Sequence, residues 1–441
     1  MSPEIKGFVL LSVLKLLFVF TVVMVGVAML TLMERKVSAW MQNRLGPNRV
    51  GYGGLLQPAA DGLKNILKEE TFPAEANPVL FTIAPALAFI PALMLSAVIP
   101  FAAPLIINSD DFGRDLGRAF DWIPGIGAAI DRAVAGGFHF VFGVMAHHGP
   151  MPMVVADVPV GFLFILAIAS LGVYGIALAG WSSNSKYSLL GGLRASAQLV
   201  SYEVALGLSL IPVLLLTGDV SFSKIISAQQ QGLWFVLPLF LSFFIFLVSG
   251  FAETNRLPFD LPEAESELIA GYHTEYSAMK FSFFFIAEYA NVVTISAMLT
   301  TLFFGGWDIP FTTWDQQGGL LQSLATGLFF FAKLMFWIFF VMWIRWTLPR
   351  FRYDQLMALG WKILTPAALV YIMLVCVVLY GIDAAGIQGP RATQWVLTGL
   401  SVVLGLALFF VLDRGMVLSG SAVRRARVAA LRHAQRLAAS S

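Results

Sequence analysis

The sequence of 441 residues contains one cysteine, Cys376, and only five histidines. A single cysteine excludes a disulfide framework, a cysteine zinc site, and an iron–sulfur cluster bound by this chain alone. No histidine falls within a long apolar run, which excludes a haem held between helices by histidine ligands. His147 and His148 are interpreted as surface residues, and we predict no metal site. The chain is therefore expected to carry no redox centre of its own.

Charge is also scarce. Only 12% of the residues are Asp, Glu, Lys or Arg, whereas 58% are hydrophobic, and the mean hydropathy is +0.79. Soluble domains average about 25% charged residues. Neither the glycine pattern of a dinucleotide site nor that of a nucleoside triphosphate loop is present. Basic segments lack the interleaved aromatic residues on which bases stack, which argues against nucleic-acid binding. The composition indicates an integral membrane protein.

Long apolar runs predict an all-α, polytopic transmembrane helical bundle. A membrane-spanning helix needs roughly 20 apolar residues, and nine runs of about this length occur in the sequence. They lie at 8–33, 79–103, 158–180, 196–217, 234–254, 280–304, 323–344, 365–387 and 394–413. Lys and Arg concentrate in the loops after every second run, beginning with the first. By the positive-inside rule the N-terminus is expected outside and the C-terminus in the cytoplasm.

We divide the chain into four parts. Residues 1–103 hold the first two spans and a long first loop, and residues 104–157 form an external insertion. Residues 158–387 form a six-helix core, and residues 388–441 add a span and a basic tail. In the first loop, the apolar residues between Leu56 and Leu67 recur at helical spacing, with charged residues elsewhere on the helix. This pattern predicts one amphipathic helix lying at the membrane interface.

The core contains an acidic loop, defined as residues 253–279. Between Glu253 and Glu275 it has only one basic residue, Arg256. Mutual repulsion and poor hydration at a membrane boundary both raise carboxylate pKa values, so the loop is a candidate for proton exchange. A solvated loop between helices is the alternative. The basic residues after the seventh span, Arg345, Arg350 and Arg352, are candidates to neutralise it or to dock a partner.

Three ionisable residues fall within predicted spans: Glu203, Glu288 and Lys333. Such groups usually face the interior of a bundle or a water-filled cavity, where they mark ion or proton paths. We favour this role for Glu203, near the cytoplasmic end of its span, and for Glu288. The long stem of Lys333 favours a structural role, because its ammonium group can reach a distant partner.

Four long motifs, taken together, resemble one family. They are ERKVSAWMQNRLGPNRVG (34–51), QPAADGLKNILKEE (57–70), GWSSNSKYSLLGGLRASAQLVSYEV (180–204) and AETNRLPFDLPEAESELIAGYHTEYSAMKF (252–281). The chain resembles the H subunit of NADH-quinone oxidoreductase, the quinone-site membrane subunit of respiratory complex I. The resemblance covers roughly residues 1–103 and 157–386. The insertion and the ninth span depart from the family pattern.

The resemblance implies site residues, cofactors, partners and location. Quinone-binding residues are expected in the first loop and the acidic loop: Glu34, Arg35, Asp61, Lys64, Lys68, Arg256, Phe259, Asp260, Glu263 and Glu265. The proton path is expected to use Glu203, Glu253 and Glu288. Quinone is implied as a substrate, with NADH, FMN and iron–sulfur clusters held only by partner subunits. Those partners are the peripheral-arm, small membrane and antiporter-like subunits, in the inner membrane of a bacterial cell.

Three other functions remain possible at this point. The chain could be the equivalent subunit of a membrane-bound hydrogenase or formate-linked complex, because the ERK motif and an acidic loop alone would not separate them. It could be an autonomous cation/proton transporter, although the sequence shows neither inverted repeats nor paired broken helices. Finally, it could be a structural anchor in which the buried acids only hold helices together.

Overall fold

The computed structural model of this chain describes residues 3–105, 151–260, 269–310, 312, 314, 320–386 and 389–407. The long helices in these ranges are α1 (Pro3–Met41), α3 (Pro78–Leu95), α6 (Gly161–Ser182), α7 (Lys186–Thr217), α9 (Phe240–Glu253), α11 (Ala278–Phe303), α12 (Leu320–Thr347) and α14 (Thr365–Ala384). Shorter ones are α2 (Gln57–Leu67), α8 (Phe222–Gln230), α13 (Tyr353–Ala358), a π-helix at Leu359–Leu364, and 3₁₀ turns at Tyr52–Gly54, Ser96–Val98 and Gly271–His273. Residues 390–407 are also helical.

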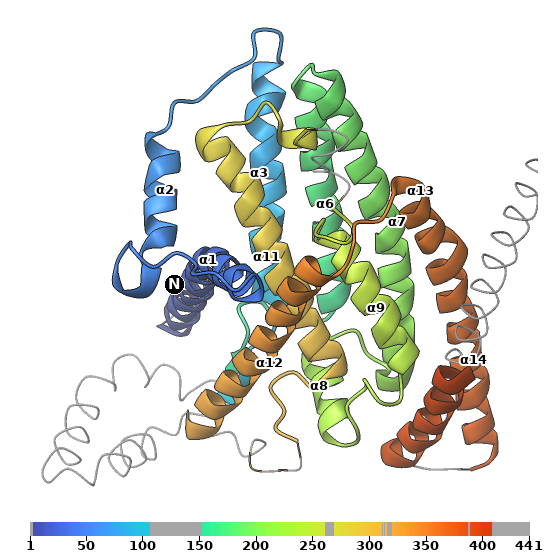
Figure 1. The fold of residues 1–441 in the computed structure, drawn as a ribbon. Coiled ribbons are helices and arrows are strands. Elements are labelled where there is room, and N and C mark those ends of the chain that lie inside the picture. The colour runs from blue at the N-terminus through green and yellow to red at the C-terminus, as the bar shows by residue number, and fades with distance from the viewer. Residues whose placement is uncertain are drawn as a thin grey trace, which may run out of the picture.

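The polytopic helical bundle predicted from the sequence is confirmed (Figure 1). Within the described ranges, seven helical segments are long and apolar enough to cross a membrane, and α9 is a shorter apolar helix. The predicted ninth span, 394–413, is helical as far as the description extends, to residue 407. The amphipathic helix predicted in the first loop is present as α2, and its apolar residues Leu63, Ile66 and Leu67 are all exposed.

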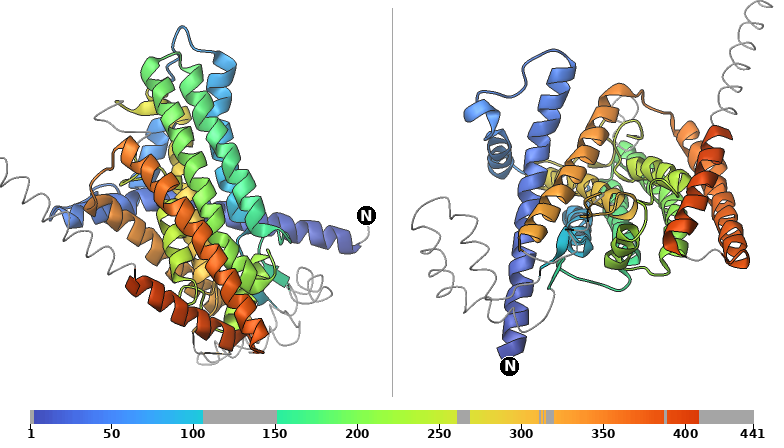
Figure 2. Two further views of the ribbon diagram at one scale, coloured as in Figure 1. Left: turned by 90° about the vertical axis from the view of Figure 1, so that its right-hand side faces the viewer. Right: turned by 90° about the horizontal axis from the view of Figure 1, so that it is seen from below.

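Helix α1 lies across one side of the bundle, and its N-terminal half extends beyond the other helices (Figure 2). It continues to Met41, eight residues beyond the predicted boundary at residue 33. The ERK motif is therefore inside the helix instead of following it. The extra turns are stabilised because the buried residues Val37 and Ala39 extend the packed face past Glu34. This continuation carries Glu34 into the protein interior.

Two other predicted boundaries were wrong. Helix α7 begins at Lys186, ten residues before the expected start of its span, so Glu203 lies near the middle of this helix and not near its end. Residues 186–195, the part of α7 before the predicted span, can be more polar than the rest. The remaining residues of α7 are already about as many as a bilayer requires. The second span ends at the 3₁₀ turn Ser96–Val98, and Pro100 then directs the chain into an extended conformation.

A small antiparallel pair of strands, β1 (Ala102–Leu105) and β2 (Met151–Met153), joins the two ends of the predicted insertion. The Lys15 ammonium group on α1 donates a hydrogen bond to the carbonyl oxygen of Pro152 at 2.8 Å. Residues 106–150, which make up most of the insertion, lie outside the described residues. The structure therefore shows how the insertion is attached to the bundle.

The close packing of α6 on α3 depends on a small residue. A Cβ added at Gly175 on α6 would lie 2.6 Å from the backbone nitrogen of Ala88 on α3, so only glycine allows this approach.

The start of α3 is capped by Asn77, whose side chain accepts hydrogen bonds from the amides of Val79 and Leu80. Pro78 follows at the first helical position, where its missing N–H costs nothing.

The C-terminal helix 390–407 is attached to the connection between α8 and α9. Gln394 is buried and accepts a hydrogen bond from the backbone amide of Leu233. Ser401 donates to the carbonyl oxygen of Pro238 at 2.6 Å, and Leu397 is completely buried. These contacts make the helix part of the bundle, while Trp395 and Val403 on its other side are exposed.

Candidate functional site

Four charged side chains meet in the interior of the bundle. They come from four separate segments: Glu34 on α1, Arg256 in the acidic loop, Glu288 on α11 and Arg345 on α12. We call them the buried charge cluster. Arg256 forms ion pairs of 2.7 Å with both Glu34 and Glu288, through Nη1 and Nε respectively. Arg345 pairs with the other oxygen of Glu34.

The cluster is almost fully removed from solvent at its centre. The Arg256 side chain is 2% exposed, Glu34 7% and Glu288 12%, while Arg345 is 24% exposed. Two positive and two negative groups make it formally neutral, which is the condition under which buried charges are tolerated. The side chain of Tyr289 adds a hydrogen bond of 2.7 Å to Glu34, and its ring lies 4.1 Å from the Arg256 guanidinium.

Electrostatics holds Arg256 in its charged form. Burial alone would lower the pKa of Arg256, but the carboxylates of Glu288 and Glu34 outweigh that effect and raise the pKa well above its usual range. Arg256 is thus a fixed positive charge shared by two carboxylates. A change in the charge of either carboxylate alters the balance of the other pair, because both depend on one guanidinium. The cluster therefore links a carboxylate of α1 electrostatically to a carboxylate of α11.

Two cavities continue from the cluster along α11. The first, which we call the inner cavity, is lined by Glu288, Glu253, Asn255 and Tyr272 among others. The second, the far cavity, is lined by Glu253, Glu203, Asn291 and Thr294 within a mostly apolar wall. Glu253 thus borders both. The three predicted proton-path residues Glu203, Glu253 and Glu288 therefore all line one or both of two cavities that share Glu253.

Each acid in this series has a different environment. Ser170 on α6 donates a hydrogen bond to Glu203. One carboxylate oxygen of Glu253 is buried and has no hydrogen-bond partner among the described residues. Glu288 is held by Arg256. The three carboxyl groups are therefore chemically distinct, although all of them lie at the centre of the helical bundle.

The predicted quinone-binding residues from Glu34 to Lys68 divide into a buried residue and an exposed group. The sequence did not predict this division. Glu34 belongs to the buried charge cluster, whereas Arg35 forms a 2.6 Å pair with Asp61 in which the side chains are 49% and 33% exposed. The next side chain along α1, Lys36, bonds to the carbonyl oxygen of Gly53. Lys64 and Lys68 are exposed on or beside α2. Adjacent residues on a helix point about 100° apart, which separates Glu34 from Arg35.

The start of the acidic loop is fixed to the segment after α12. Arg350 pairs with Asp260 at 2.9 Å, so one carboxylate of the loop is paired with a basic residue of this segment, one of the two roles considered for it. Phe259 is 4% exposed and stacks on Phe351, with ring centroids 5.6 Å apart. Phe259 therefore packs inside the protein, against the segment that follows α12. The predicted quinone-binding residues Glu263 and Glu265 lie outside the described residues.

Gln198 on α7 holds the same segment from the opposite side. Its side-chain amide donates to the carbonyl oxygens of Ala252 and Phe259, at 2.9 and 2.8 Å. The backbone on both sides of Arg256 is thereby tied to one residue of α7. This arrangement fixes the position of the arginine between its two carboxylates.

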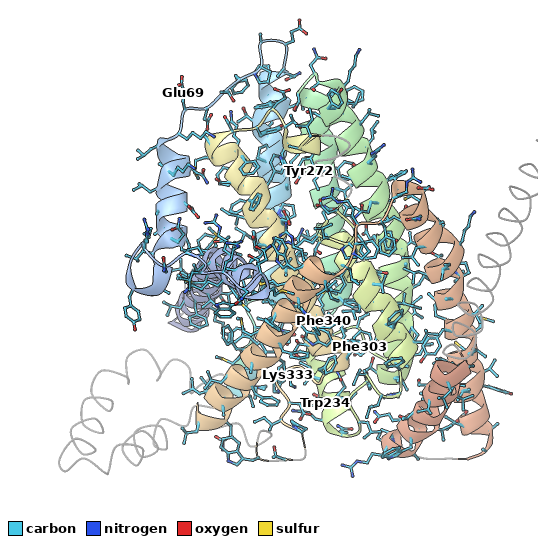
Figure 3. All side chains as sticks on the ribbon, viewed as in Figure 1. Glu69, Trp234, Tyr272, Phe303, Lys333 and Phe340 are labelled. Atoms are coloured by element: carbon cyan, nitrogen blue, oxygen red, sulfur yellow. The ribbon has the colours of Figure 1, made fainter. Side chains whose placement is uncertain are left out.

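Lys333 has the structural role that its long stem favoured. Its ammonium group donates to the carbonyl oxygens of Phe304, Gly306 and Asp308 at 2.6, 2.9 and 2.8 Å, where α11 ends. The ring of Trp234 lies 4.3 Å away. Figure 3 shows Lys333, Trp234 and Phe303 together at the lower end of the bundle, far from Tyr272 near the top. The ammonium group thus binds the turn that follows α11, and a cation is also favourable near the C-terminus of a helix.

Sequence reasoning missed three residues of the site. Arg345 was expected to face the acidic loop, but it pairs with Glu34. Ser170 and Asn291 were not selected, although each is a polar residue within an apolar run. Asn291 lies three residues after Glu288, a spacing that places both on one side of a helix. The spacing of Glu288 and Asn291 is the feature of the sequence that could have identified Asn291.

Comparisons with known proteins agree on one family. A model of the NADH dehydrogenase family matches residues 14–376. A protein of Koribacter versatilis, named as an H subunit of NADH-quinone oxidoreductase, is 48% identical over 374 residues, which is 84% of this chain and 97% of that protein. A Geobacter metallireducens protein of the same name is 46% identical, over 85% of this chain and 98% of its own. The H subunit of Flavobacterium johnsoniae is 44% identical, over 87% and 99%.

Proposed function

The chain belongs to the NADH dehydrogenase family, and on that premise we propose that it is the quinone-binding, coupling membrane subunit of NADH-quinone oxidoreductase, complex I. It is a multi-pass membrane protein and acts as one subunit of an enzyme complex. The observation that supports this mechanism is the buried charge cluster, because it links Glu34 on α1 to Glu288 on α11 through Arg256.

Quinone would approach along α1 and α2. The exposed pair of Arg35 and Asp61, together with Lys64 and Lys68, supplies polar contacts beside the exposed apolar face of α2. A quinone needs both kinds of surface, since its ring carries two hydrogen-bond acceptors and its tail is apolar. Glu34 follows on the buried side of α1. The acidic loop with Asp260, and with Glu263 and Glu265 beyond the described residues, would close the chamber on the side of the peripheral arm.

Reduction of quinone creates negative charge and a demand for protons in a poorly hydrated site. A carboxylate near the quinone responds to that charge, and the response passes to Glu288 because both acids of the buried charge cluster share Arg256. Glu253 and Glu203 then continue the proton path away from the quinone. The chemistry of electron delivery belongs to partners, namely the FMN and iron–sulfur clusters of the peripheral arm. The antiporter-like subunits would receive the change of charge that passes along these acids.

The orientation follows from the charge of the loops. The basic first loop, the acidic loop and the segment 348–352 lie on the side that the positive-inside rule assigns to the cytoplasm. The peripheral arm would therefore dock on that side of a bacterial inner membrane, with the N-terminus outside and the C-terminus in the cytoplasm.

The direct test is to isolate the chain with its native partners from solubilised membranes and to assay NADH:quinone reduction and proton pumping. Glu203→Gln and Glu288→Gln are expected to lower pumping by at least tenfold, roughly the effect of removing a proton-transfer group. Glu69→Gln is the matched control, because Glu69 is exposed and points away from the bundle (Figure 3). Normal pumping in both core variants would remove these acids from the path.

The isolated partners also separate the alternatives. Hydrogenase-type partners in place of NADH-oxidising ones would change the electron donor while keeping the fold. A chain that purifies alone and moves cations in liposomes would make it an autonomous transporter. The names of the relatives favour the NADH-quinone enzyme.

A further inference from the structure

The inner and far cavities are each large enough for water. The space open to the centre of a water molecule is about 40 Å³ in the inner cavity and about 20 Å³ in the far cavity. By this measure a cavity holds one water once it reaches about 10–15 Å³. A water also needs two to four polar partners, so its position depends on which polar side chains face the cavity.

Asn291 and Glu253 are the polar residues that line both cavities, and we call the region between them the junction. The wall of the far cavity is otherwise mostly apolar: Leu166, Ile165 and Met298 are typical members. Thr294 also lines it, but its hydroxyl donates to the carbonyl oxygen of Ala290 at 3.0 Å, inside its own helix. Polar contacts for water at the junction are therefore limited to very few groups.

The side chain of Asn291 makes no hydrogen bond to another residue in the part of the chain that the structure describes. A primary amide can donate two hydrogen bonds and accept two, and amides enclosed in a protein are rarely left unused. Asn291 is partly buried. Glu253 also has unused capacity, because one of its carboxylate oxygens is fully buried and has no hydrogen-bond partner among the described residues. Water at the junction of the two cavities would satisfy both side chains at once.

We propose that Asn291 is a positioning residue that holds water at this junction, and so joins the Glu288 side of the path to Glu203 through Glu253. The claim about water concerns this chain alone, whereas its use for proton transfer rests on the proposed function. An amide suits this position because it donates and accepts simultaneously and does not titrate. It can therefore support a water chain in either orientation without trapping the proton.

Three variants test the proposal in the intact complex. Asn291→Leu keeps nearly the same side-chain size and removes all hydrogen bonding, whereas Asn291→Asp keeps the shape and the acceptor oxygens. Thr294→Val is the control: it changes the same cavity one turn along α11, at a hydroxyl already used within the helix. We expect pumping to fall about tenfold in Asn291→Leu. It should stay within about twofold in Thr294→Val, and Asn291→Asp should restore at least part of the loss.

The second measurement is a cryo-electron-microscopy map of the complex that shows ordered water. The proposal expects water beside Asn291 in both cavities of the wild type and its loss in Asn291→Leu. Dry cavities in the wild type, or unchanged water and pumping in Asn291→Leu, would overturn it. If the complex does not reduce quinone with NADH, the proposed function fails, but the water densities still decide the role of Asn291.

Discussion

Replacing Arg256 by methionine should be among the most damaging single changes in the chain. Methionine keeps much of the apolar stem and removes the charge, so the volume of the site changes little. The buried charge cluster then holds two carboxylates, Glu34 and Glu288, against one remaining cation, Arg345. Both ion pairs of 2.7 Å are lost in a region where Arg256 is only 2% exposed.

Breaking a buried pair by removing one partner costs about 3–5 kcal/mol, because a charge is left uncompensated. At roughly 1.4 kcal/mol per tenfold, this corresponds to about two to four powers of ten in stability. The surface pair gives the matched control. Arg35 and Asp61 lie 2.6 Å apart but are 49% and 33% exposed, so Arg35→Met should cost no more than about 1 kcal/mol after screening by solvent.

The assay is the amount of assembled complex in membranes, together with the temperature at which the solubilised complex loses activity. Arg256→Met should lower both strongly and Arg35→Met only slightly. Combining Arg256→Met with Glu288→Gln removes one carboxylate along with the guanidinium and restores neutrality, so a substantial part of the loss should return. Equal effects of the two arginine variants, or no recovery in the double variant, would refute the electrostatic reasoning.

Further changes test the supporting structure. Lys333→Met removes the ammonium donor from three carbonyl oxygens in the turn that follows α11. The inactivation temperature should fall by the equivalent of about 2–4 kcal/mol, and an unchanged temperature would contradict a stabilising role of these three bonds. In Gly191→Ala the added Cβ would lie 2.7 Å from backbone atoms of the turn Gly271–His273, so less complex should assemble. Gly207→Ala, which meets nothing closer than 3.8 Å, should assemble normally, and equal losses would exclude a steric cause. Gln394→Leu removes the acceptor for the Leu233 amide and should speed proteolysis of the C-terminal helix; an unaltered rate would show that other contacts hold it.

The sequence by itself determined the class of protein and the approximate location of each helix. Apolar runs need only about 20 residues of local information, which is why the spans and the amphipathic helix α2 were predictable. The same local information identified Glu203, Glu288 and Lys333, because a charge inside an apolar run is visible without knowing its surroundings. Helix ends were less predictable, since α1 and α7 continue beyond the apolar run on contacts made with other segments.

Only the tertiary structure decided which charges meet. Glu34 stands next to Arg35 in the sequence, yet its partner Arg256 is 222 residues away, while Arg35 turns to Asp61. Lys333 and Glu288 both looked like buried charges, but one ends a helix and the other joins the charge cluster. The reason is physical: a buried charge is stabilised by whichever opposite charge the crossing of helices brings within about 3 Å. That crossing is set by side-chain packing over the whole bundle, which no local pattern contains.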